Sequence, residues 1–493
     1  MRLDEYTACD GTGLARLIAA GEVTHAELAR CVSDAAAGVN PAINAVIELY
    51  PDALEAMPGA ALTAPFHGVP TLTKDFPVEA GRLASFGSRL AHGFRANADS
   101  VYWRRLREAG LVNVGRTTSS EFGVAATTET LLYGATRNPW DISRGVSGSS
   151  GGAAAAVAAG IVPFAQGSDG GGSIRNPAAF CGLIGLKPSR GRVTGSPGAV
   201  APLLGLATSF MLTRSVRDTA ALLDACQGPD AGDGYEIAQP SQSYLSAINV
   251  PPRNLRIAVC TRSWSGVRVD PEIIAAAEAS ASRLEAFGHR VEIASPDFDY
   301  GAFLHAQKII WAADSAASLP ALAAHMGRVL DEHTVGSTVM ALYREGLSLS
   351  AAQLMMALAA YDHVTRQIGQ FLDRYDLLLT PTSTMLPEPI GSFNPDRNDL
   401  DIDAVFDDLA PKETFTALFN ATGHPAISLP LGRSLTGLPV GIQLIGPFGR
   451  ENVLLGVARQ LEAELDTGNG IWGQGLPAIH AGKLVEAGKS GES

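Results

Sequence analysis

Charged side chains are scarce in this sequence of 493 residues: they make up 18% of it, against roughly a quarter in an average soluble domain. Hydrophobic residues make up 46%, which is enough to bury a large core. This balance excludes the disordered class, because disordered chains have too little apolar surface to offset the entropy lost on folding. The glycines show no G-X-Y period, which excludes a collagen-like fibre. We therefore expect a globular protein.

Basic residues are the scarcer of the two charge classes, with 37 Lys and Arg against 50 Asp and Glu and a net charge of −13. An acidic protein repels phosphate backbones and anionic lipid surfaces. We therefore expect no nucleic acid and no membrane among its partners.

Long apolar runs are also missing. The best candidate, residues 153–162, is short, rich in Ala and Gly, and ended by Pro163, so it is not expected to cross a bilayer. The first ten residues, MRLDEYTACD, lack the basic-then-apolar order of a signal peptide. The expected location is the cytoplasm.

Cysteines are few: there are five, and no two form a C-x-x-C pair. An odd number without such a pair favours neither a disulfide framework nor a zinc ribbon. We interpret Cys181 as a small buried hydrophobe rather than a nucleophile, because Ala178, Ala179 and Phe180 precede it. A G-x-x-x-x-G-K-[ST] motif is absent as well, which argues against a phosphate-binding loop.

Neither a repeat nor a linker rich in Pro, Ser or Gly divides the chain, so we predict one domain over residues 1–493. Helices are expected over about residues 1–60, with Thr24 and Glu27 as a capping box for one of them. A core is expected over about residues 65–230, of which about residues 113–193 are dense in Gly, Ser and Ala, and a further part over about 254–480. Residues 481–493 have the composition of a frayed tail.

The part after residue 254 begins with a strand–helix–strand pattern. Residues 255–260 read as a strand, Asp270 and Pro271 mark the start of a helix that Gly288 ends, and residues 291–293 read as the next strand. Such a unit implies parallel strands in a sheet. A helical stretch and two further buried strands are expected at residues 302–373, 377–379 and 426–429.

Glycines are abundant, at 53, and they gather beside serines in two segments, residues 147–152 and 167–175. Glycines before a serine allow successive backbone N–H groups to point toward one place, which makes an anion-binding concavity beside a hydroxyl group. In acyl chemistry, such a concavity serves as an oxyanion hole next to a nucleophile.

A serine nucleophile needs a base, and the residues alone leave the choice open. Residues 148–152 fit G-x-S-x-G centred on Ser150, which would require an Asp or Glu and then a histidine downstream. His424 is one of the downstream histidines, but its setting favours a turn or pocket-wall residue over a base. A desolvated lysine is the other option, since burial lowers the pKa of an ammonium group. Lys74 follows an apolar strand in a charge-poor chain, but an ion pair with Asp75 would explain it equally well.

Several spaced motifs together resemble the amidase signature family. Lys74, Ser149 and Ser173 fall inside three of them, with separations of 149 − 74 = 75 and 173 − 149 = 24 residues that suit the family. The match extends over almost the whole chain and is highly specific. The motifs are residues 68–75 (GVPTLTKD), 148–152 (GSSGG), 167–177 (GSDGGGSIRNP), 180–188 (FCGLIGLKP) and 437–443 (GLPVGIQ).

The resemblance implies a single α/β/α-layered domain around a large mixed, mostly parallel sheet, and a Ser–cisSer–Lys triad that hydrolyses carboxamides. It implies Ser173 as the nucleophile, Ser149 as a bridging serine preceded by a cis peptide bond, and Lys74 as the base. It implies no metal ion and no organic cofactor. By the same resemblance, the oxyanion hole would be formed by the N–H groups of Gly170, Gly171, Gly172 and Ser173, with Asp169, Arg175 and Ser150 as supporting residues.

One position departs from the family pattern, because Ser147 stands where the family commonly has glycine. The bridging position is intact, so this puts the shape of the loop in question rather than the chemistry. We expect the walls of the substrate pocket to include residues 121–128 and helices between residues 302 and 358.

The expected substrate is a small-molecule amide or carbamate with apolar aliphatic or aryl parts. Residues 134–140 and 213–220 are similar to segments of cyclic-dimer hydrolases, aryl acylamidases and urethanases within the family. Two alternatives stay open at this point: the amidase subunit of a tRNA amidotransferase, and a non-catalytic binding protein with the same fold.

Overall fold

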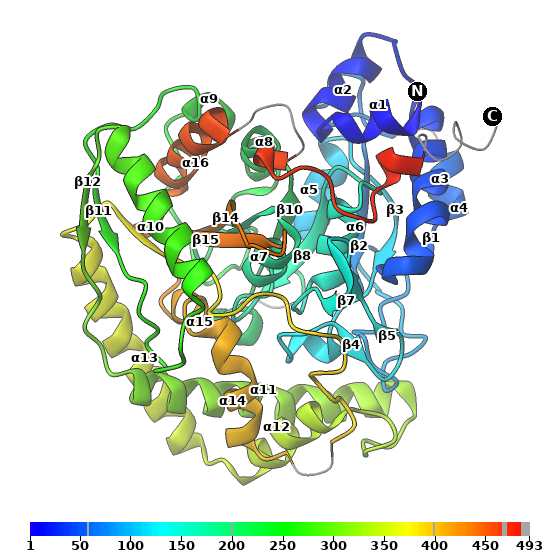
Figure 1. Ribbon diagram of the computed structural model, residues 1–493. Helices are drawn as coiled ribbons and strands as arrows, with labels where there is room; N and C mark the ends of the chain where they lie inside the picture. The colour runs from blue at the N-terminus through cyan, green and yellow to red at the C-terminus, as the bar shows by residue number, and fades with distance from the viewer. Residues whose placement is uncertain (57–58, 199–200, 398–399, 466–470, 485–493) are drawn as a thin grey trace.

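The structure is a computed structural model that describes residues 1–56, 59–198, 201–397, 400–465 and 471–484. Eleven strands form one large sheet through the centre of the molecule (Figure 1). These strands are β1 (Val46–Leu49), β2 (Pro70–Lys74), β3 (Val112–Thr117), β8 (Ala165–Asp169), β9 (Ile184–Lys187), β10 (Thr208–Thr213), β11 (Arg256–Val259), β12 (Arg290–Ile293), β13 (Leu377–Pro381), β14 (Ala426–Arg433) and β15 (Pro439–Ile445).

The strand order is β1-β3-β2-β8-β10-β9-β14-β15-β13-β11-β12, so strands from all three predicted parts of the chain belong to this one sheet. The sheet is mixed, as expected, but the expectation of mostly parallel strands was wrong. Only β2 with β3 and β8, and β11 with β12 and β13, pair in parallel; the other six pairs are antiparallel. The strand–helix–strand pattern after residue 254 correctly predicts the parallel pairing of β11 and β12. It gives no information about the pairing of the central strands, which lie in other parts of the chain.

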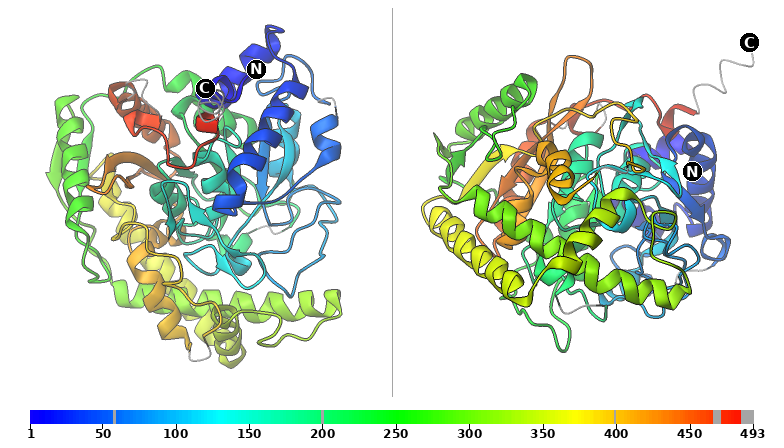
Figure 2. Two further views of the ribbon diagram at one scale, coloured as in Figure 1. Left: turned by 45° about the vertical axis from the view of Figure 1, so that its right-hand side comes forward. Right: turned by 90° about the horizontal axis from the view of Figure 1, so that it is seen from below.

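Helices surround the sheet. They are α1 (Leu3–Ala8), α2 (Gly11–Ala19), α3 (His25–Ile43), α4 (Pro51–Glu55), α5 (Val101–Glu108), α6 (Gly151–Ala158), α7 (Arg175–Cys181), α8 (Val216–Cys226), α9 (Tyr244–Ala247), α10 (Pro271–Ala286), α11 (Tyr300–Met326), α12 (Ser337–Ser348), α13 (Ala351–Leu372), α14 (Ile402–Glu413), α15 (Ala417–Ala421) and α16 (Glu451–Leu465). Helix α11 packs against both α12 and α13 along the lower edge in Figure 1, and the three helices cross the underside in Figure 2.

Two local expectations are confirmed. Thr24 caps α3, and Glu27 closes the capping box. The unit β11–α10–β12 forms where the strand–helix–strand pattern placed it, with parallel strands. The capping box and the strand–helix–strand pattern both depend on residues close together in the sequence, so they can be recognised without the tertiary structure.

Two boundaries were wrong. The N-terminal part is not wholly helical, because β1 lies within it and pairs with β3. The predicted tail does not begin at Ala481: residues Ala481–Lys483 form a short 3-10 helix, Ala481 is fully buried, and its N–H donates to the carbonyl of Ala159. The rest of that prediction, residues 485–493, lies outside the described residues.

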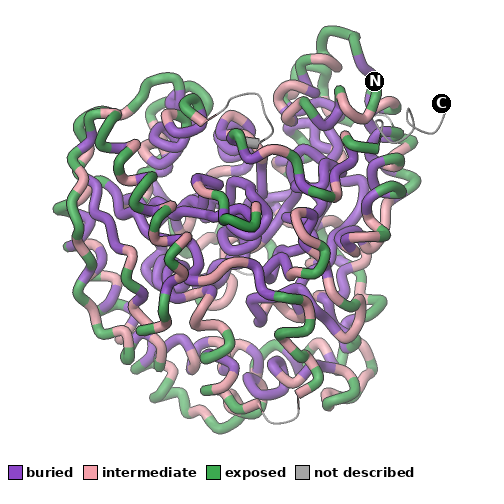
Figure 3. Tube along the Cα trace, viewed as in Figure 1, coloured by how far each residue is buried: buried purple, intermediate pink, exposed green. Residues whose placement is uncertain are grey.

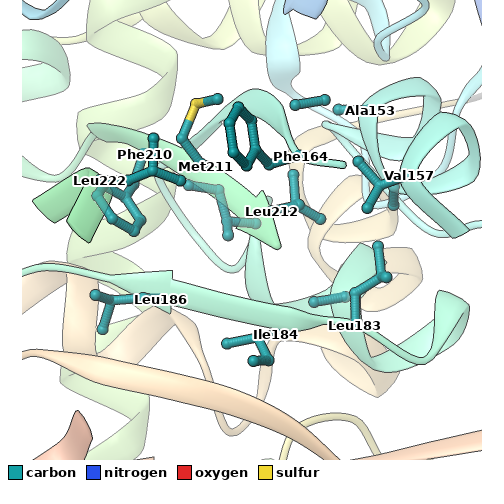
Figure 4. Packing of buried hydrophobic residues seen from close by; sticks show 14 of the residues in the cluster. Ala153, Val157, Phe164, Leu183, Ile184, Leu186, Phe210, Met211, Leu212 and Leu222 are labelled. Carbon is teal, nitrogen blue, oxygen red and sulfur yellow. The ribbon is translucent and has the colours of Figure 1, made fainter. Parts of the chain in front are cut away.

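The small-residue helix α6 packs against β2, β8 and β10 within the hydrophobic core. Every residue of α6 is buried, which fits a helix that is apolar on all sides. Figure 4 shows Ala153 and Val157 of this helix near Phe164 and Leu212, and Figure 3 shows that buried residues fill the centre of the molecule. Among the described residues, no helix combines the length and the apolar character that crossing a membrane requires.

The close approach of α6 to β3 gives a prediction about stability. A Cβ atom added at Gly152 would lie 2.5 Å from the backbone N and O of Thr118, so we expect Gly152→Ala to destabilise the protein by about 1–3 kcal/mol. Gly369 in α13 is the matched control, because a Cβ atom there would meet nothing within 4 Å. Gly369→Ala should be neutral or stabilising by up to about 1 kcal/mol.

Urea unfolding followed by circular dichroism measures both changes in the free energy of unfolding. Equal effects of the two substitutions would contradict the packing argument.

Candidate active site

A cavity of about 380 Å³ lies between the sheet and the long helices, and its walls are mostly apolar. Three serines, Ser149, Ser168 and Ser173, line it together with Gly170. Both segments expected to form the pocket wall contribute, residues 121–128 and the helices after residue 302. The other lining residues are Phe76, Phe86, Phe122, Gly123, Val124, Leu203, Ala207, Trp311, Asp314, Ser315, Ser318, Leu319, Leu322 and Val339.

Lys74 is the last residue of β2, an interior strand of the sheet between β3 and β8, and it is only 1% exposed. Its Nζ donates hydrogen bonds to Ser149 Oγ at 2.6 Å and to Ser168 Oγ at 3.0 Å. Burial lowers the pKa of Lys74 to about 7, although the charges of Asp169 and Asp75 act in the opposite direction. The amine can therefore lose its proton near neutral pH.

Asp75 is not the hydrogen-bonding partner of Lys74. Its carboxylate forms an ion pair with Arg116 at 2.5 Å and accepts hydrogen bonds from the N–H groups of Ser85 and Gly87. The alternative of an ion pair at the end of the strand is therefore not what the structure contains. Asp75 therefore binds the loop after the strand, whereas Lys74 Nζ contacts the hydroxyl groups of Ser149 and Ser168.

Ser149 lies in the loop between β7 (Asp141–Gly145) and α6, and the peptide bond between Gly148 and Ser149 is cis, as the resemblance implies. The backbone carbonyl of Ser149 accepts a hydrogen bond from the N–H of Ser120 at 3.1 Å. Ser147 has a φ of 59°, in the left-handed region that glycine adopts most easily. Its Oγ donates to the carbonyl of Ala126 at 3.2 Å, so the side chain anchors the loop at the position where the family commonly has glycine.

Ser150 and His424 do not form a nucleophile–base pair. Ser150 Oγ donates to the carbonyl of Ser168 at 3.1 Å and accepts from its N–H at 3.2 Å. His424 Nδ1 lies 2.9 Å from Thr422 Oγ1, and burial, with the charges of Lys187 and Arg190, lowers its pKa to about 3. The G-x-S-x-G interpretation with His424 as the base is therefore wrong, and Ser150 holds the end of β8.

Ser173 follows three glycines in the turn between β8 and α7, and it is 5% exposed. Within the described part of the chain, the N–H groups of Gly170, Gly171, Gly172 and Ser173 have no hydrogen-bond acceptor. A Cβ atom at Gly172 would lie 2.4 Å from Thr416 Oγ1, and its φ of 143° is unfavourable for other residues. The turn therefore needs glycine for both its conformation and its packing.

Asp169 and Arg175 hold the two ends of this turn together, and both side chains are fully buried. Arg175 donates to both carboxylate oxygens of Asp169, at 2.9 and 2.8 Å, and the N–H of Ile174 donates to the same carboxylate. Burial raises the pKa of Asp169, but the charge and hydrogen bonds of Arg175 outweigh it and hold that pKa well below its usual range. On its other side, Arg175 donates to Gln443 Oε1 at 2.8 Å.

The sequence analysis did not single out Ser168, whose Oγ accepts a hydrogen bond from Lys74 Nζ at 3.0 Å. It also lines a second cavity of about 210 Å³, whose walls include Lys187 and Arg190. The signal available was strand alternation: Asp169 and Ser168 point to opposite faces of β8. That signal becomes useful only once β2 is known to lie beside β8.

Other groups of the site were also outside the sequence-based prediction. Asn420 donates to the carbonyl and the carboxylate of Asp169, and Thr416 donates to the carbonyl of Gly171 at 2.6 Å. Cys181 is buried, and burial raises the pKa of its thiol. The described residues contain no group of three or more His, Cys, Asp or Glu side chains arranged to hold a metal ion.

Comparison with known proteins agrees with this geometry. The model of the amidase family matches residues 27–455. A 6-aminohexanoate-cyclic-dimer hydrolase from Paenarthrobacter ureafaciens is 37% identical over 470 residues, which cover 92% of this chain and 94% of that protein.

Solved structures give the same result. The structure of a 6-aminohexanoate cyclic dimer hydrolase complexed with substrate superimposes with a TM-score of 0.90 at 34% identity, covering 96% of this chain and all of that one. A bacterial aryl acylamidase of the amidase signature family superimposes with a TM-score of 0.83 at 26% identity, covering 95% and 98%. The chain therefore belongs to the amidase family, whose members are hydrolases that act on amide C–N bonds.

Proposed function

We propose that Ser173 is the nucleophile of this amidase, that Ser149 is the bridging serine, and that neutral Lys74 is the base. The observation that carries the proposal is the 2.6 Å contact between Lys74 Nζ and Ser149 Oγ, inside a buried site that shares a cavity with Ser173. Activation of a serine by a lysine requires a neutral amine, and the lowered pKa of Lys74 supplies it.

The first half of the reaction forms an acyl-enzyme. Lys74 takes a proton from Ser149, Ser149 takes the proton of Ser173, and Ser173 Oγ forms a bond to the carbonyl carbon of the amide. The negative charge that develops on the carbonyl oxygen is stabilised by the N–H groups of Gly170 to Ser173. The intermediate collapses when the C–N bond breaks, and the relay returns the proton to the leaving nitrogen, which departs as a neutral amine or ammonia.

Water completes the cycle by the same route. It gives a proton to the relay as it attacks the ester of Ser173, and the proton returns to Ser173 Oγ when the C–O bond breaks. Asp169 and Arg175 take no part in proton transfer in this scheme. They position the glycine turn, because their hydrogen bonds hold both of its ends.

The substrate we propose is a small-molecule amide, or a carbamate, with apolar aliphatic or aryl parts. The cavity supports this choice, because aromatic and aliphatic side chains form most of its wall and its volume suits a small molecule. The names of two relatives, a 6-aminohexanoate-cyclic-dimer hydrolase and an aryl acylamidase, also support this choice. The net charge of −13 argues against a tRNA-bound substrate.

Replacement of the nucleophile gives the first prediction of this scheme. Ser173→Ala should lower kcat by at least about a thousandfold and abolish covalent labelling by a phosphonyl fluoride, because no other group can form the ester. The control is Ser282→Ala on the exposed face of α10, which should keep both properties. Undiminished turnover by Ser173→Ala would contradict the assignment.

The pH dependence gives a second prediction. The active form of Lys74 is neutral, so kcat/KM should rise with pH through about 7, where the lowered pKa of this lysine lies. Lys74→Met should lose about 10²- to 10⁴-fold in kcat/KM and flatten this rise.

Lys187→Met is the matched control, since burial lowers the pKa of Lys187 to about 7 as well, while its Nζ donates to the carbonyl of Pro188. If the rise of kcat/KM with pH disappeared in Lys187→Met and persisted in Lys74→Met, the base would be Lys187, and the assignment of Lys74 would be wrong.

A substrate screen separates the amidase from the remaining alternatives. We expect the isolated chain to hydrolyse 4-nitroacetanilide, a small carbamate, or a linear or cyclic aliphatic amide, measured by release of the amine. Activity that appears only with a partner subunit would indicate a tRNA amidotransferase. If none of these substrates is hydrolysed and the phosphonyl fluoride does not label the protein, the result would indicate a binding protein.

A further inference from the structure

One face of α11 forms a wall of the catalytic cavity. Six of its residues line that cavity, and their spacing follows the turns of a helix, so all six project from the same face. This face combines one aromatic, one acidic, two hydroxyl and two aliphatic side chains. The six residues are Trp311, Asp314, Ser315, Ser318, Leu319 and Leu322.

Among the described residues that line this cavity, Asp314 is the only charged one. Within the described part of the chain, its carboxylate has no hydrogen bond and no ion pair. Lys308, one of the basic residues of the same helix, is already paired with Asp403 at 2.6 Å. Burial raises the pKa of Asp314, and no nearby cation acts against that effect.

A carboxylate without a partner in an apolar cavity is unfavourable, because it has lost part of its hydration and gained no hydrogen bond. A ligand that brings a positive charge with N–H donors removes this penalty. The rings of Trp311, Phe86 and Phe122 line the same cavity, and aromatic faces also attract cations. The rest of the wall suits an alkyl chain between that charge and the reacting amide.

We propose that Asp314 and the surrounding aromatic side chains form a binding site for an ammonium group of the substrate. The substrate class is then an amide whose acyl part carries a terminal amino group, separated from the scissile bond by an apolar chain. This inference rests on the proposed function, since it assumes that Ser173 attacks a substrate held in the same cavity. Asp314 sets specificity and does not take part in bond breaking.

The test compares two substrates that differ only at the end of the chain. In 6-aminohexanoyl 4-nitroanilide the chain ends in an ammonium group, and in heptanoyl 4-nitroanilide a methyl group takes its place. Release of 4-nitroaniline gives kcat/KM for each. Asp314→Asn keeps the shape of the side chain and removes its charge. The ratio of kcat/KM for the amino substrate to kcat/KM for the neutral substrate should therefore fall about tenfold or more, mainly through a higher KM for the amino substrate.

Asp362→Asn is the matched control. Asp362 is exposed on the neighbouring helix α13, so its replacement changes the net charge equally without altering the cavity. Its substrate ratio should equal that of the unchanged protein. Amino-acyl anilides from 4-aminobutanoyl to 8-amino-octanoyl determine which chain length reaches Asp314.

Each outcome has one meaning. If both types of anilide are hydrolysed and Asp314→Asn leaves their ratio unchanged at every chain length, the ammonium site is wrong while the proposed function stands. If 6-acetamidohexanoyl 4-nitroanilide is preferred as strongly as the amino substrate, Asp314 binds a neutral hydrogen-bonding group and the proposal is overturned. If no anilide is hydrolysed and Ser173 is not labelled, the proposed function fails, and the inference fails with it.

Discussion

The contact between Lys74 and Ser149 depends on a lysine that is buried without a carboxylate partner. An interior strand places the side chain under the protein surface, and the acid beside it in the sequence is occupied by Arg116. Desolvation then favours the neutral amine over the ammonium ion. In the described part of the chain, the hydroxyl groups of Ser149 and Ser168 are the only hydrogen-bonding partners of this amine.

A network of hydrogen bonds surrounds the contact between Lys74 and Ser149. The loop that carries Ser149 and the turn that carries Ser173 are joined by the hydrogen bond from the N–H of Ser150 to the carbonyl of Ser173. The ion pair of Asp169 and Arg175 holds the turn, and the hydrogen bond from Arg175 to Gln443 in β15 connects this pair to the other half of the sheet. Small residues allow these backbones to approach closely, and buried charge-assisted hydrogen bonds keep them in place.

The cavity has a partly different origin, because helices α11 and α12 supply a part of its wall that lies outside the motifs. α11 crosses the underside of the molecule (Figure 2). One of its faces lines the cavity that Ser173 also lines. The motif residues are suited to the chemistry of an amide bond, whatever the rest of the substrate is. The helix face, with a single carboxylate among one aromatic, two hydroxyl and two aliphatic side chains, is suited to selecting among amides. In the scheme that we propose, chemistry and specificity therefore come from separate segments of the chain.

The sequence by itself determined the motifs that contain Lys74, Ser149 and Ser173, and the cap of α3, since these signals lie in short continuous segments. It did not determine which strands pair in parallel, that Ser168 contacts Lys74, or that Asp314 faces the cavity. Those facts were decided by the tertiary structure, because they depend on segments far apart in the chain: Lys74 and Ser168 are 94 residues apart, and Arg175 and Gln443 are 268 apart. Local patterns specify conformation, whereas the partner of a buried polar group is chosen by the packing of the whole sheet.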